Sequence, residues 1–196
     1  MPTLYFAPGS SSMAPHIALH EIGAPFDARL ISFAKNEQRA PAFLALNPEG
    51  KVPTMVTESG AVITEVAACL LYLAKKFPAA KLLPPGLDAE AQAVSWMSFA
   101  AATLHGARGR GPEIGRATWQ LAETKLAGRD WALGEFSVAD IHLFRLYWRF
   151  RPLLDLSTAM PALEAHYQRM MARQAVQRTI EIETRIGYEL PGQAGR

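Results

Sequence analysis

Cysteine is almost absent from this sequence: Cys69 is the only one in 196 residues. One thiol excludes an internal disulfide and any zinc site built from several thiolates. Cys69 lies in the apolar, helix-like stretch VAACLLYLA, so we interpret it as a buried, unreactive side chain rather than a nucleophile. His16 and His20 are four residues apart but have no third ligand nearby, so we expect no metal site.

Long hydrophobic runs and a strong charge of one sign are missing as well. No apolar run approaches the roughly 20 residues that cross a bilayer, and the start of the chain, MPTLYFAPG, has neither region of a secretory signal. The formal net charge of +2 is far from the dense positive charge of a nucleic-acid-binding protein. We therefore expect a cytoplasmic protein that binds neither membranes nor nucleic acid.

Residues 1–77 alternate short strand-like and helix-like segments. The pattern predicts a strand, a helix and a strand, followed by two strands and a helix, in the stretches TLYF, MAPHIALHEIG, FDARLISF, VPTMVT, AVI and EVAACLLYLAKKF. The polar residues and glycine at 57–60 are typical of a hairpin between the last two strands. This order predicts an α+β domain with a small mixed sheet.

Residues 78–88, PAAKLLPPGLD, interrupt the helical pattern with prolines and a glycine, and we assign them as a linker. Residues 89–196 carry only helix-like segments, which predicts an all-helical second domain. Within it, Ser137 and Asp140 have the spacing of a capping box and should begin a helix that is apolar on most of its circumference.

The turn PGSSSMAPH, between the first strand and first helix, contains three consecutive serines. Such a turn could cap the helix, or it could present hydroxyls and backbone N–H groups to an anion. Further along, Thr64 is typical of a helix N-cap, and Glu65 of an acidic residue in the first helical turn.

Four segments, LYFAPGSSSMAPHIAL, NPEGKVPTMV, ITEVAACLLYLA and GEFSVADIHLF, resemble the glutathione transferases in order and spacing, and the bacterial beta class most of all. The resemblance covers nearly the whole chain. It implies a thioredoxin-like domain that binds glutathione, followed by a helical domain that forms the pocket for a small, largely apolar electrophile. It also implies a homodimer that uses glutathione as co-substrate and has no prosthetic group.

The resemblance assigns roles in glutathione binding to several residues of the first domain. The Val52-Pro53 bond should be cis, with the backbone of Val52 pairing with the cysteinyl part of glutathione. Glu65 should meet the γ-glutamyl amine, and Lys35 the glycyl carboxylate. Val66 departs from the family, which usually has serine or glycine there, so its N–H remains but no hydroxyl can donate.

The resemblance also selects Ser11 among the serines of the turn. Ser11 aligns with a common beta-class cysteine, so thiol exchange is excluded, and a hydrogen bond from the hydroxyl to the glutathione sulfur remains. Tyr5 is the rival donor, because several classes use a tyrosine at the end of the first strand. The alternative is that one serine caps the helix and the others fill a polar turn.

In the second domain, His105 aligns with a family histidine that faces glutathione and the second substrate, and Ser98 with a family asparagine near the same site. For His105, an interaction with the free carbonyls at a helix end is the alternative. The sequence thus predicts a conjugating glutathione transferase involved in detoxification. The alternatives are a glutathione-binding carrier of apolar ligands and a non-enzymatic protein-interaction module.

Overall fold

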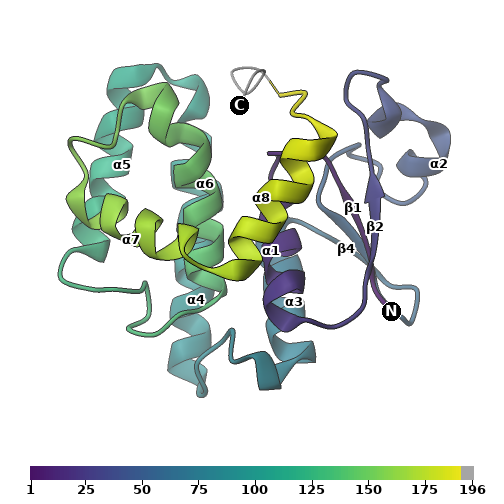
Figure 1. The fold of residues 1–196 in the computed structure, drawn as a ribbon, viewed down its shortest axis with the longest axis horizontal. Helices are drawn as coiled ribbons and strands as arrows, with labels where there is room; N and C mark the ends of the chain where they lie inside the picture. Colours follow the sequence, from purple (N-terminus) through teal and green to yellow (C-terminus); the bar gives the residue numbers. More distant parts are fainter. Residues whose placement is uncertain (191–196) are drawn as a thin grey trace. The chain divides into compact units, whose positions relative to one another are not determined.

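The computed structural model describes residues 1–190, which fall into two compact units. One unit joins Met1–Leu73 to the chain from Gln174 onward, and the other is Ala74–Arg173. The first contains the sheet, and the second is built from helices (Figure 1). Within residues 1–190, no helix is both long enough and apolar enough to cross a bilayer.

A four-stranded mixed sheet forms the centre of the first unit. Its strands are β1 (Thr3–Phe6), β2 (Asp27–Leu30), β3 (Thr54–Val56) and β4 (Val62–Thr64), in the order β2-β1-β3-β4. β1 is parallel to β2, as a helical crossover requires, and antiparallel to β3, which is antiparallel to β4. The predicted strand-helix-strand unit and the hairpin after it are therefore confirmed.

Helices cover this sheet. α1 (Met13–Ile22) connects β1 to β2 and is buried from Met13 to Leu19, and α3 (Val66–Lys76) follows β4. α8 (Gln174–Ile186), the last helix among residues 1–190, packs against α1, although more than 150 residues separate them in the sequence (Figure 1). By its contacts α8 belongs with the sheet, while the domain limits that we assigned from the sequence stay a prediction.

One turn of helix in the first unit was not predicted. α2 (Pro41–Leu44) follows a 3-10 turn at Glu37–Arg39. Pro41 stands in the first turn of α2, where its fixed φ and missing N–H are tolerated. The element is too short to show a hydrophobic repeat, and for that reason sequence periodicity does not reveal it.

The second unit consists of packed helices, as predicted. α4 (Leu87–Phe99) continues into a π-helical stretch, Ala100–Leu104, and then a 3-10 turn, Gly106–Gly109. α5 (Pro112–Leu126), α6 (Val138–Leu154) and α7 (Pro161–Met171) complete the core. α6 is buried throughout from Val138 to Phe150 and contacts α4, α5 and α7, which confirms its central position.

Two expectations about the start of α3 are wrong. Thr64 is the last residue of strand β4 rather than a helix N-cap, and α3 begins at Val66 with no acidic residue in its first turn. Glu65 alone connects the strand to the helix and has a left-handed backbone conformation, with φ of +67°. A strand that passes into a helix through one residue needs this sharp change of direction, which leaves no room for the predicted cap.

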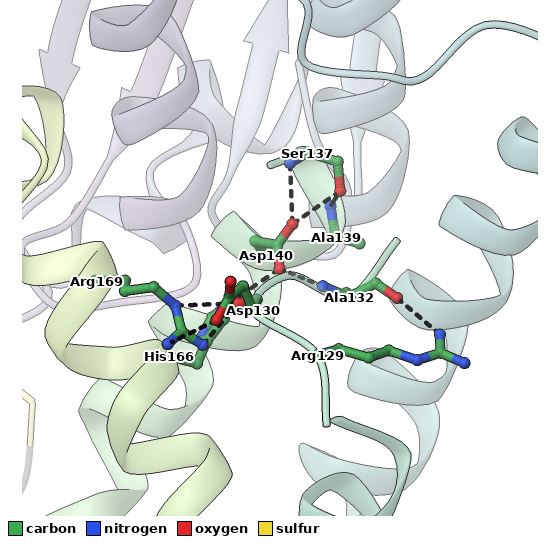
Figure 2. Close-up of polar contacts among 8 residues, drawn as sticks. All are labelled: Arg129, Asp130, Ala132, Ser137, Ala139, Asp140, His166 and Arg169. Carbon is green, nitrogen blue, oxygen red and sulfur yellow. Dashed lines mark hydrogen bonds and ion pairs between the residues drawn. The ribbon is translucent and has the colours of Figure 1, made fainter. Parts of the chain in front are cut away.

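The capping box at the start of α6 is confirmed and is part of a larger buried network (Figure 2). The Ser137 hydroxyl accepts from the Ala139 N–H, while Asp140 Oδ2 accepts from the Ser137 N–H at 2.9 Å. Asp140 Oδ1 also accepts from the Ala132 N–H at 2.8 Å and lies 3.1 Å from His166 Nε2. One fully buried carboxylate thus ties the loop before α6, the start of α6 and the helix α7 together.

We expect Asp140→Ala to destabilise the protein by about 3–5 kcal/mol, because it leaves several buried donors without their acceptor. Urea unfolding followed by circular dichroism measures the change. Asp130→Ala is the matched control: its carboxylate is 78% exposed and pairs only at the surface with Arg169, so the free energy of unfolding should change by less than about 0.5 kcal/mol. Equal effects of both substitutions would contradict the role of Asp140.

Candidate functional site

The turn between β1 and α1 engages two of its three serine hydroxyls internally. Ser12 Oγ is completely buried, accepts from the Ala7 N–H at 3.1 Å and donates to the Ala7 carbonyl at 3.2 Å. Ser10 Oγ lies 2.7 Å from Ser12 Oγ and accepts from the Ser12 N–H. Ser12 occupies the N-cap position, but its side chain makes no capping hydrogen bond to the helix. The hydroxyls of Ser10 and Ser12 therefore close the turn.

Ser11 differs from both of its neighbours. Its side chain is partly exposed, and its hydroxyl makes no hydrogen bond to any residue that the structure describes. Ser11 precedes Ser12, the N-cap residue of the ten-residue helix α1, so the positive end of the helix dipole is close to it. A free hydroxyl beside a helix N-terminus can donate a hydrogen bond to an anionic atom of a ligand.

Behind this turn lies a buried carboxylate that the sequence did not lead us to select. Glu183 of α8 is fully buried; its Oε2 accepts from the Gly9 N–H at 2.7 Å, and its Oε1 lies 2.9 Å from His16 Nδ1. Gly9 has a left-handed backbone, with φ of +68°. Glu183 shares the buried face of α8 with Val176 and Thr179, and this helical spacing is the signal that could have identified it.

Tyr5 extends to the opposite face of the sheet from its neighbours in β1. Phe6 packs against His16 of α1, with ring centroids 4.9 Å apart, whereas Tyr5 packs against Phe43 of α2 at 5.6 Å. The Arg29 guanidinium lies over the Tyr5 ring, 5.8 Å from its centroid. Tyr5 is therefore on the α2 side of β1 and is half-buried.

The loop before β3 contains backbone groups that a ligand could pair with. The Val52-Pro53 peptide bond is cis, as the resemblance predicted. The Asn47 side-chain amide braces the loop by donating to the Lys51 carbonyl at 2.8 Å and to Thr54 Oγ1 at 3.0 Å. Within the described chain, the N–H and C=O of Val52 make no hydrogen bond, so a ligand with an extended backbone can pair with them.

Glu65 and Val66 lie where β4 passes into α3. The Glu65 side chain is exposed, and its negative charge is one of the smaller influences that raise the pKa of Lys51, after the hydrogen bond and the charge of Glu49. Val66 is only 8% exposed, and its side chain has no polar atom. Thr64, next to Glu65, pairs with Thr54 of β3, so Glu65 lies close to the loop that contains Val52.

Lys35 is exposed on the loop after β2, and its N–H donates to Ser32 Oγ at 3.2 Å.

Ser98 and His105 belong to the second unit. Ser98 is exposed on α4, while His105 follows the π-helical stretch, with its N–H donating to the Ala100 carbonyl at 3.0 Å. Sequence periodicity predicted one uninterrupted helix up to His105 and did not reveal the π-helical stretch.

Two further histidines are kept neutral by burial. His142 on α6 was not selected from the sequence; burial, reinforced by the charges of Arg145 and His105, lowers its pKa to about 3. The pKa of His20 is lowered to about 4, mainly by burial. The rings of His16 and His20 pack at 4.9 Å, and among the described residues no group of three potential ligands could hold a metal ion.

Cys69 is fully buried in α3, where its thiol lies 3.6 Å from the Ile63 carbonyl. Burial, together with the charge of Glu65, raises the pKa of the thiol to about 12. The thiolate is the reactive form, so the structure agrees with an unreactive side chain.

We expect iodoacetamide to leave Cys69 unmodified in the native protein at pH 8, because the raised pKa keeps the thiol protonated and burial blocks access. In urea the pKa returns to its ordinary value near 8.5, and labelling should become fast. Intact mass measured against time reports both rates. Fast labelling of the folded protein would contradict the burial of this thiol.

Two family models match parts of this chain. Residues 10–76 match the family model described as "Glutathione S-transferase, N-terminal domain", and residues 116–174 match "Glutathione S-transferase, C-terminal domain". The chain is 32% identical to glutathione S-transferase GST-4.5 of Xanthomonas campestris, over 92% of this chain and 98% of that protein. It is 29% identical to GstA of Escherichia coli O157:H7 over the same shares of the two chains.

Solved structures give the same result. A sphingomonad glutathione S-transferase complexed with glutathione matches with a TM-score of 0.84 and 34% identity, over 93% of this chain and 98% of that one. A glutathione transferase homologue from Sulfitobacter with bound glutathione matches with a TM-score of 0.84 and 32% identity, over the same shares. The beta-class enzyme of Sphingomonas chungbukensis matches at 0.82 and 31%, over 92% and 98%. This chain belongs to the glutathione S-transferase family.

Proposed function

We propose that this protein is a glutathione transferase that binds glutathione on its sheet-containing unit and transfers the thiolate to a small, largely apolar electrophile. Family membership and the relatives solved with glutathione bound support the first substrate. The observation that carries the proposal is the turn before α1, in which Ser10 and Ser12 are engaged with each other while Ser11 Oγ has no partner among residues 1–190.

Ser11 would act by donating a hydrogen bond to the glutathione sulfur, with the N-terminus of α1 adding positive potential. A free thiol has a pKa near 8.5, so only a few per cent is thiolate at neutral pH. Lowering this pKa by about 2 units requires about 2.7 kcal/mol of preferential stabilisation of the thiolate. Tyr5 remains the rival donor, although its ring packs on the α2 side of β1.

The remaining parts of glutathione would extend along the edge of this unit. The Val52 backbone, beside Pro53, would pair with the cysteinyl residue, Glu65 would meet the γ-glutamyl amine, and Lys35 would meet the glycyl carboxylate. Val66 offers its N–H but no hydroxyl. The missing hydrogen bond to a charged group corresponds to about 1.5–3 kcal/mol, or a roughly ten- to hundredfold weaker affinity, unless another donor replaces it.

The second unit would supply the pocket for the electrophile, and by the family resemblance His105 would face glutathione and the second substrate, with Ser98 near the same site. No metal or redox group is needed for a reaction that depends on thiolate stabilisation and proximity. The beta-class assignment, the homodimer, the cytoplasmic location and a role in detoxification remain predictions. Because Val66 weakens one expected contact, a glutathione-binding carrier or an interaction module is the second candidate.

The decisive experiment is a titration of glutathione at neutral pH, followed by the ultraviolet difference absorbance of the bound thiolate. S-methylglutathione, which cannot ionise at sulfur, is the control for binding. We expect a saturable thiolate signal. Binding of the methylated analogue without such a signal from glutathione would favour the carrier, and binding of neither ligand would favour the interaction module.

Ser11→Ala should lower the rate of conjugation to an aryl halide by roughly ten- to a hundredfold, because it removes one hydrogen bond to the developing thiolate. Glutathione affinity should change much less. Steady-state kinetics and calorimetry separate the two effects. Ser59→Ala, at an exposed position of the β3–β4 hairpin, is the matched control. Unchanged turnover in Ser11→Ala would exclude the role proposed for this hydroxyl.

A further inference from the structure

The loop after β2 already binds a carboxylate, and that carboxylate belongs to the protein itself. Glu189, three residues beyond the end of α8, accepts hydrogen bonds from the Ser32 hydroxyl at 2.7 Å, from the Ala34 N–H at 3.0 Å and from the Phe33 N–H. Successive N–H groups that converge in this way form a concave anion-binding nest. We define the anion nest as the Ser32 hydroxyl with the N–H groups of Phe33 and Ala34.

The anion nest is held in shape by contacts that do not involve Glu189. The Ser32 N–H donates to the Glu37 carboxylate at 2.8 Å, and the Glu37 N–H donates to the Ser32 carbonyl at 3.0 Å. The Lys35 N–H donates to Ser32 Oγ, which orients that hydroxyl toward Glu189. Because these bonds fix the loop by itself, the nest is preorganised for a carboxylate.

Electrostatics favours an anion at this place. The hydrogen bond from the Ala34 N–H is the largest cause of a lowered pKa at Glu189, followed by the bonds from Ser32 and Phe33 and by the positive charge of Lys35. Glu189 is nevertheless at the surface, so its contact with the nest opens easily. A free carboxylate can replace it without disturbing a core.

The chain reaches the anion nest through a defined turn. α8 ends at Ile186, and Gly187 follows with φ of +100°, its N–H donating to the Glu183 carbonyl at 3.0 Å. The left-handed conformation, which favours glycine, turns the chain away from the helix axis. Two residues later, Glu189 meets the nest.

We propose that the anion nest is a carboxylate-binding site and that Glu189 is its internal ligand, which the terminal carboxylate of an incoming peptide must displace. Under the proposed function, on which this step rests, that carboxylate is the glycyl end of glutathione, placed there by Lys35. Glu189 therefore lowers the apparent affinity for glutathione. If it occupies the nest nine-tenths of the time, the apparent Kd rises about tenfold.

N-acetylglycine, which has a single carboxylate and none of the other groups of glutathione, tests the site directly. Its binding is followed by the amide chemical shifts of Phe33 and Ala34, with N-acetylglycinamide as the uncharged control ligand. Glu189→Ala should bind the acid about tenfold more tightly than the unmodified protein does. Glu181→Ala is the matched control, because Glu181 is exposed on α8 and, within residues 1–190, pairs only with Arg185.

Equal affinity of Glu189→Ala and the unmodified protein for N-acetylglycine, or amide shifts that the acid does not change, would overturn the proposal. A second titration tests the competition with glutathione. Glu189→Ala should tighten binding of glutathione but not of its glycyl ethyl ester, and equal tightening of both would also overturn it. If glutathione binds to no variant, the proposed function fails, while the N-acetylglycine titration still decides on the nest.

Discussion

The candidate site depends on the hydrogen bonds that the buried Glu183 carboxylate makes to the first turn and to α1. A charged or strongly polar group that is completely removed from water needs nearby donors, and Glu183 finds them in the Gly9 N–H and the His16 ring. Gly9 belongs to the turn that presents Ser11, and His16 to the helix that follows. Helix α8 thereby fixes the position of the first turn, and the Ser11 hydroxyl, which has no partner among the described residues, lies on a rigid support.

The second unit also contains a buried carboxylate that joins several segments. Asp140, also fully buried, collects donors from Ala132 and Ser137 and lies beside His166 of α7. In both units an acidic residue joins segments that are distant in sequence, because a buried carboxylate restricts its partners to a few directions. Apolar packing supplies the larger part of the stability, whereas these two carboxylates select one arrangement of loops and helices.

Much of the fold follows from local patterns in the sequence. The strands, the hairpin, the long helices and the capping box at Ser137 each have a short-range signal, and the structure contains all of them. The predicted helix cap at Thr64 and Glu65 was wrong because residue type alone suggested it. The actual connection between β4 and α3 is a single residue with a left-handed backbone. The π-helical stretch after α4 was not predicted because its composition is that of an ordinary helix.

The site was predicted in part, and the difference between the serines shows the limit. Three adjacent serines look alike in the sequence, and only their hydrogen bonds in the folded turn separate Ser11 from Ser10 and Ser12. Glu183 and Glu189 were not selected because their partners lie more than 150 residues away in the chain. The helical spacing on α8 could have marked Glu183 as buried, but contacts of that range follow from tertiary structure, and no local pattern identifies the partners.

The return of α8 to the sheet has a consequence for the order in which the protein is made. Ala74–Arg173 is continuous in the sequence, whereas the sheet unit needs Glu183 from a helix that begins at Gln174. Synthesis from the N-terminus therefore delivers every segment of the helical unit before it delivers α8. The turn that presents Ser11 is made before the helical unit, but its supporting carboxylate is made after that unit, so the turn reaches its final position only once the whole helical unit has been synthesised.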